Sequence, residues 1–138
     1  MNLLIHHRPD IAHEHSRLIK ELVDHWIALK KKDAQFDDNI NNLCNLFAEG
    51  ASVWEPATTH TGKSNIRKFF ETSATAPWQA SNLGLLDLNT HVFTLTEGYV
   101  TARRVTVIFT DYDNGAEPVK IKKIIFGQYL SYLVALLM

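Results

Sequence analysis

The sequence has a single cysteine, no block of like charges longer than Lys30-Lys31-Lys32 and no hydrophobic run long enough to cross a membrane. With Cys44 alone, no disulfide can form within the chain, which is typical of proteins from a reducing compartment. Fourteen basic and fifteen acidic side chains leave a net charge of −1, so no overall field attracts nucleic acid or an anionic membrane. The most apolar stretch, residues 129–138, has about half the length that a transmembrane helix needs.

Proline and glycine are also sparse, at four and six of 138 residues. No linker, repeat or low-complexity segment divides the chain, so we expect one domain over residues 1–138, with residues 1–10 as a candidate flexible arm. The first residues lack the long apolar region and small-residue cleavage site of a secretory signal. Together with the lone cysteine, this predicts a cytoplasmic protein.

Apolar residues recur at helical spacing in the first half of the chain. The pattern predicts helices over about residues 11–31, 38–49 and 61–74, with Asp10 as an N-cap and Gly50 as the residue that follows the second helix. The expected buried stripes are Leu18, Leu22, Trp26 and Leu29; Ile40, Leu43, Cys44 and Phe47; and Ile66, Phe69 and Phe70.

Strand-forming residues dominate after Pro77. We expect three long strands over about residues 85–95, 99–110 and 119–130, because turn signals lie at residues 96–98 and 113–115. A shorter strand, Val53 to Glu55, precedes the third helix. Helices followed by an antiparallel meander predict an α+β domain.

Glu55 is the residue that most suggests chemistry, because it ends a short apolar strand immediately before Pro56. In a mostly apolar cavity, desolvation would raise the pKa of this carboxyl toward neutrality, which suits a general base or acid. The alternative is a solvated strand-end glutamate, or one paired with Arg67 or Lys63.

The stretch "LFAEGASVWEPATTHTGKSNIRKFFE" and the later "DLNTHVFTLTEGYVTARRVTVIF" resemble the nuclear transport factor 2-like (NTF2-like) superfamily. The resemblance is greatest to its SnoaL-like and ketosteroid isomerase-like members and spans most of the chain. It implies a cystatin-like fold, in which a strongly curved antiparallel sheet forms a cone or half-barrel under about three N-terminal helices. The cavity of that fold holds a small, usually apolar molecule.

The resemblance implies a catalytic role for Glu55, which stands at the position of the isomerase base. His60, in the loop over the expected cavity mouth, is our second catalytic candidate because it could supply a titratable group near neutral pH; the alternative is a solvated loop residue. Trp26 stands where those isomerases have a tyrosine, and it offers an N–H in place of the acidic hydroxyl. The late segment "VKIKKIIFGQYL" contains no acid where they have a second oxyanion donor, which argues against ketosteroid isomerisation itself. The expected substrate-binding residues are Trp26, Trp54, Phe69, Phe70, Arg103 and Tyr129.

The remaining histidines and arginines have simpler interpretations. His13 and His15, with two further histidines upstream, could bind a metal, but they point to different sides of a helix. We therefore expect a solvated arm and no metal site, and we expect His25 at the boundary of the first helix's apolar stripe. One of Arg103 and Arg104 could point inward and the other outward, and the inward arginine would then need Glu55 or Asp87 as an acid partner. The alternative, which we favour, is a cross-strand surface salt bridge.

Two functions fit these residues. The first is a cofactor-independent isomerase, cyclase, dehydratase or epoxide hydrolase that acts on an apolar cyclic or polyketide-like substrate by acid/base chemistry. The second is a non-catalytic ligand-binding or dimerisation module of the same fold. The apolar C-terminal stretch would be exposed in a monomer, so we expect a homodimer with Tyr129, Tyr132 and Leu133 near its interface.

Overall fold

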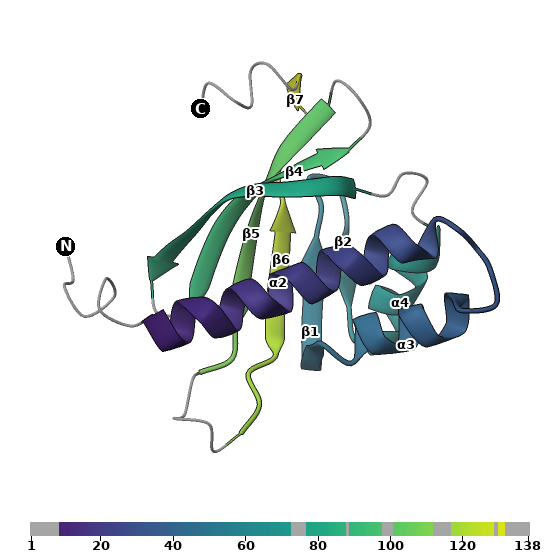
Figure 1. Ribbon diagram of the computed structural model, residues 1–138, viewed down its shortest axis with the longest axis horizontal. Coiled ribbons are helices and arrows are strands. Elements are labelled where there is room, and N and C mark those ends of the chain that lie inside the picture. Colours follow the sequence, from purple (N-terminus) through teal and green to yellow (C-terminus); the bar gives the residue numbers. More distant parts are fainter. Residues whose placement is uncertain are drawn as a thin grey trace.

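The computed structural model describes residues 9–72, 77–87, 89–97, 101–111, 117–128 and 130–131. Over these ranges the chain forms three helices and seven strands, and the helices cover one face of a curved sheet (Figure 1). The elements are α2 (Pro9–Leu29), α3 (Phe36–Cys44), β1 (Phe47–Trp54), β2 (Thr59–Thr61), α4 (Lys63–Thr72), β3 (Pro77–Asp87), β4 (Thr90–Glu97), β5 (Thr101–Phe109), β6 (Ile121–Phe126) and β7 (Leu130–Ser131). This confirms the predicted α+β architecture.

The sheet is mixed. Its strand order is β2-β1-β6-β5-β4-β3, with β7 added to β5, and β1 pairs with β6 in parallel while the other pairs are antiparallel. The predicted meander therefore holds for β3 to β6 but not for the whole sheet. The parallel pair allows β1, which follows α3, to lie beside β6, which follows about 70 residues later in the sequence.

The core lies between α2, α4 and the helix-covered face of the sheet. Trp26, Phe47, Phe70, Phe93 and Phe109 are among its largest fully buried side chains. Removing such apolar area from water contributes about 25 cal/mol for each Å² and is the main source of stability. The stripes predicted for the three helices are buried as expected, and Cys44 is buried with them.

The predicted second helix runs too far. It ends at Cys44, and residues 47–54 form β1, because β2 and β6 supply hydrogen-bonding partners for both edges of this segment. Gly50 has the positive φ of 73° that a residue after a helix often takes. Here it lies within β1, where the register to β6 shifts between Phe47 and Ser52.

The predicted strand over residues 85–95 is in fact a hairpin. β3 ends at Asp87 and β4 begins at Thr90, and these two residues face each other across the turn. The break carries no glycine or proline, and its turn-favouring residues, Asp87 and Asn89, are separated by Leu88, so the apolar residues on either side concealed it. The first helix was placed within two residues of its observed ends, but Asp10 lies inside its first turn and does not precede it.

Candidate functional site

The end of β1 and the adjoining strand β2 bring two titratable side chains together. The Glu55 Oε2 atom lies 3.0 Å from His60 Nε2, and the two side chains are 32% and 24% exposed. The backbone fixes this arrangement, since the Glu55 N–H donates to the Thr58 carbonyl and closes a short turn between the strands. Thus the two residues predicted to be catalytic do lie in contact.

His60 belongs to the helix-covered face of the sheet. It lies opposite Val53, a core residue of β1, and directly opposed residues of an antiparallel pair point to the same side. Its ring lies 4.9 Å from the ring of Phe69 on α4. The polar pair therefore adjoins the aromatic interior while it keeps some access to water.

An aromatic cluster continues from this pair into the interior. Phe69 lies against Phe126 at 5.8 Å between ring centroids, and Trp26 contacts both rings. Phe70 meets Trp26 edge-on at 5.0 Å. These are the offset and edge-to-face geometries that aromatic rings favour, so α2, α4 and β6 are joined through this cluster.

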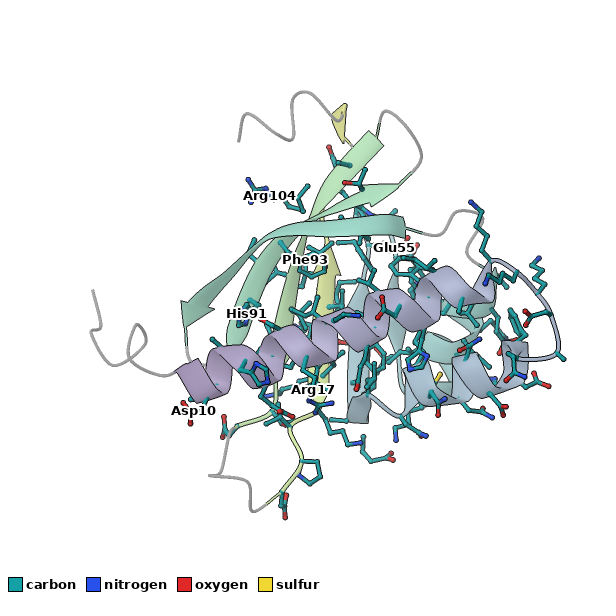
Figure 2. The ribbon with its side chains drawn as sticks, viewed as in Figure 1. Asp10, Arg17, Glu55, His91, Phe93 and Arg104 are labelled. Carbon is teal, nitrogen blue, oxygen red and sulfur yellow. The ribbon has the colours of Figure 1, made fainter. Side chains whose placement is uncertain are left out.

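Arg103 extends the cluster on β5. Its guanidinium carbon lies 4.2 Å above the ring of Phe126, and the residue is buried on the helix-covered face. Arg104, the next residue, points away from the helices in Figure 2, as strand alternation requires. A surface salt bridge of Arg103 is therefore ruled out by its burial. The alternative in which one arginine points inward and the other outward is correct.

Trp26 does not pair with Glu55. Its indole Nε1 is buried and makes no hydrogen bond within the described part of the chain. A buried donor without an acceptor costs about 1–3 kcal/mol, so its presence in an apolar interior needs an explanation. An acceptor on a bound molecule would provide one.

The suggested cationic partners of Glu55 are engaged elsewhere. Lys63 lies 3.4 Å from Glu49, and Arg67 pairs with Glu71 at 2.7 Å. Their positions on α4 direct them to its exposed side, whereas Glu55 adjoins the inner side through His60. The expected alternative of an ion pair with either cation is therefore wrong.

Trp54 faces away from this site. It is opposite Thr59 and beside Ile125 on the outer face of the sheet, with the Lys123 ammonium 4.3 Å from its ring centroid. Because neighbouring strand residues alternate sides, Trp54 cannot line the same space as Val53 and His60. The prediction that Trp54 contacts a substrate in the interior is therefore wrong, because the strand register places this side chain on the outer face.

The other residues singled out from the sequence lie in different environments. Phe69 and Phe70 are buried beside Trp26, Tyr129 lies outside the described residues, and His25 is half-buried, 3.4 Å from Asn39 Oδ1. Burial raises the pKa of the Cys44 thiol, which disfavours a reactive thiolate. Within the described ranges, no three His, Cys, Asp or Glu side chains are placed to hold a metal ion.

His15 contradicts the expectation of a solvated arm. Residues 1–8 lie outside the described ranges, but His15 is in α2 and fully buried against β5 and His91 of β4. Sequence reasoning missed His91 and Phe126 altogether. The only signal for His91 was its place in a strand with alternating apolar residues, which marks the inner face but gives no partner.

An open groove of about 670 Å³ lies at the other end of β1. Phe47, Glu49, Lys63, Thr110 and Lys120 are among the residues that line it, and neither Glu55 nor His60 is. Its charges are mixed, and Glu49 and Lys63 already pair with each other across it. We therefore place the candidate site at the Glu55–His60 pair.

Comparison with known proteins supports the fold. No family sequence profile matches the chain, and neither does any functionally curated protein. Among solved structures, a SnoaL-like protein from Agrobacterium tumefaciens, provisionally assigned as an isomerase, superposes with a TM-score of 0.60 at 12% identity, over 84% of this chain and 99% of that one. A SnoaL-like protein of unknown function from Burkholderia thailandensis gives 0.57 at 13% identity, over 88% and 96%.

A third similar structure is SalBIII, an epoxide hydrolase/cyclase-like enzyme of pyran ring formation in the polyether salinomycin. It has a TM-score of 0.53 at 13% identity, over 83% of this chain and 93% of that one. No helix in the described part of the chain combines the length and apolar character needed to cross a bilayer. The protein thus has the cystatin-like fold found in the NTF2-like superfamily and its SnoaL-like proteins.

Proposed function

We propose that this protein binds a small apolar molecule and performs acid/base chemistry on it without a cofactor. The observation that carries the proposal is the 3.0 Å contact between Glu55 and His60 at the edge of an aromatic interior. Isomerisation, cyclisation, dehydration and epoxide opening each require a proton to be taken from one atom and given to another. A carboxylate beside an imidazole supplies both functions near neutral pH.

In this mechanism Glu55 takes the proton from the substrate. The His60 Nε2–H donates to the Glu55 carboxylate and fixes its orientation. Glu55 can return the proton to another atom of the substrate, or a protonated His60 can donate to the product. In the second case Glu55 loses its proton to water and His60 regains one from water, since both side chains are partly exposed. Negative charge that develops on a substrate oxygen would be stabilised by the Trp26 indole N–H. Phe69, Phe70 and Arg103 would enclose the substrate, and Tyr129 remains a proposed contact.

The substrate class rests on the apolar surroundings and on two similar structures. The rings of Trp26, Phe69 and Phe126 favour a cyclic or polyketide-like molecule with few charges. The Agrobacterium tumefaciens protein and the pyran-forming enzyme SalBIII carry isomerase and epoxide hydrolase/cyclase-like assignments. These assignments belong to those proteins, and for this chain they guide the choice of substrates to test.

A substrate screen in deuterated water tests the proposal. The purified protein is incubated with a panel of cyclic ketones, cyclic epoxides and hydroxy-ketones, and products and incorporated deuterium are measured by mass spectrometry. We expect at least one apolar cyclic compound to react faster than it does in buffer. Compounds that bind, as detected by calorimetry, but neither react nor exchange protons would support the non-catalytic alternative.

That alternative has one specific observation in its favour. Trp26, Phe69, Phe70 and Phe126 pack closely against one another, and such packing also suits a stable interior that takes no part in chemistry. The chain would then be a binding or dimerisation module in which Glu55 and His60 form a structural pair. The screen above separates the two functions by turnover.

We also propose that the protein is a homodimer. Trp54 and Ile125 are large apolar side chains exposed side by side on the outer face of the sheet, and the apolar residues 129–138 follow in sequence. Multi-angle light scattering at micromolar concentration should give about twice the mass of 15.7 kDa. A single species at the monomer mass would contradict the proposal.

A further inference from the structure

Two histidine rings meet beneath the first half of α2. His15 Nδ1 lies 3.0 Å from His91 Nδ1, and the residues are 0% and 2% exposed. The rings are nearly perpendicular, and the His15 ring is stacked on Phe109 at 4.0 Å. This pair takes no part in the proposed chemistry, because the Glu55–His60 pair adjoins the aromatic cluster at the other half of α2 (Figure 2).

The contact between two Nδ1 atoms limits how many protons the pair can hold. When both rings are neutral, one Nδ1–H donates and the other Nδ1 accepts, which satisfies both atoms. A first added proton would place a net charge in a buried, mostly apolar site. A second would put two N–H groups against each other and break the contact.

The described residues that lie against the pair from β5 are apolar. From β5, Val107 lies opposite His91 in register and Phe109 stacks on His15, and both are apolar and buried. On α2, the neighbouring acid Glu14 is already paired with Arg17, and His13 is exposed on another side of the helix. Asp10 lies in the first turn, and Asp111 after β5 accepts a hydrogen bond from Asn89 at 2.8 Å.

Burial accordingly lowers the pKa of His91 below its usual value of 6.5. A histidine whose pKa is lower in the folded state is neutral in both states above about pH 6.5, so in that range it makes stability no more dependent on pH. Below that pH the unfolded chain takes up the proton first, and the folded state loses stability as the pH falls. The lowered pKa of His91 agrees with the burial of its ring against His15.

We propose that the His15–His91 pair is an acid-sensitive latch that holds the first half of α2 on the sheet at neutral pH and releases it in mild acid. Trp26 lies on the same helix, about three turns further along, so release would also disturb the wall of the proposed substrate site. The latch itself depends on the buried pair alone and stands whether or not the protein is an enzyme.

Hydrogen exchange followed by mass spectrometry tests the latch on the full chain. Protection of amides in residues 11–20 is compared at about pH 7.5 and about pH 5.5, after correction for the intrinsic pH dependence of exchange. We expect protection to fall by up to tenfold for each pH unit below about 6.5, the limit set by one titrating group. Amides of α3 serve as the internal control and should change less.

His91→Asn and His13→Asn form the matched pair of variants. Asparagine cannot take up a proton, so His91→Asn should remove most of the difference between the two pH values. His13→Asn, at an exposed position of the same helix, should retain it. A latch is excluded if wild-type protection in residues 11–20 is the same at both pH values, or if both variants behave alike.

A second measurement uses only the wild-type protein, in case His91→Asn does not fold. Proton NMR of the histidine rings should show that the His91 ring begins to titrate only below pH 6.5, together with loss of native signals from α2. Titration of every ring at its ordinary pKa would overturn the proposal. Addition of Zn²⁺ is the remaining control, since stabilisation by the metal at neutral pH would mean that the pair is a metal site instead.

Discussion

A Glu55→Gln variant is expected to keep the fold and to lose about 10²–10⁴-fold in the rate of proton transfer on a substrate identified by the screen. Glutamine has nearly the same shape and can still contact His60 Nε2, but it cannot accept a proton. The loss should appear in kcat and kcat/KM together, because only the chemical step loses a group. Steady-state kinetics with matched circular dichroism spectra would measure it.

Glu49→Gln is the control for this experiment. Glu49 lies on β1, the strand that Glu55 directly follows, and is strongly exposed beside Lys63, away from the aromatic interior. It should retain wild-type kinetics. If Glu55→Gln is as active as Glu49→Gln, Glu55 has no part in the reaction, and the binding-module interpretation becomes the better one.

The second large effect concerns Trp26, whose replacement by alanine should cost about 3–5 kcal/mol in the free energy of unfolding. Trp26 is 2% exposed and contacts Phe69, Phe70 and Phe126, so its removal leaves a cavity at the junction of three elements. Urea unfolding followed by circular dichroism would give the value. The unsatisfied Nε1 would disappear with the side chain, which places the expected cost toward the lower end of the range.

Trp54→Ala provides the comparison with an exposed tryptophan. This side chain is 42% exposed on the outer face and stacks only with Lys123 among the described ring and cation contacts. Its loss should cost about 1 kcal/mol or less, as for other exposed cation–π contacts. Equal costs for the two variants would mean that Trp26 lines an open, hydrated space and does not serve as core.

The sequence predicted the helices better than the sheet for a physical reason. Helical periodicity is local, so the stripe that includes Leu18, Leu22 and Trp26 placed α2 within two residues at each end. Strand pairing depends on partners far along the chain. The parallel contact of β1 with β6 left no local trace, and residues 47–49 were therefore assigned to a helix.

In the candidate site, too, the sequence indicated residues in local motifs but not contacts between distant segments. Glu55 and His60 were each candidates from the local sequence, but their contact was not predicted, although they are only five residues apart. Arg103, which adjoins Phe126, and His15, which meets His91, have partners that only the tertiary structure provides. The two histidines are separated by 76 positions, and no pattern in either segment indicates the other.

The parallel pairing of β1 with β6 also has a consequence for the order of events during synthesis. Residues 47–54 emerge from the ribosome early, but one edge of this strand finds its partner only after residues 121–126 have emerged. Until then α2, α3 and α4 have only part of the surface against which they bury their apolar faces. Such non-local pairing slows folding and lengthens the exposure of aggregation-prone segments. The helical layer can therefore complete its packing only after residues 121–126 have emerged.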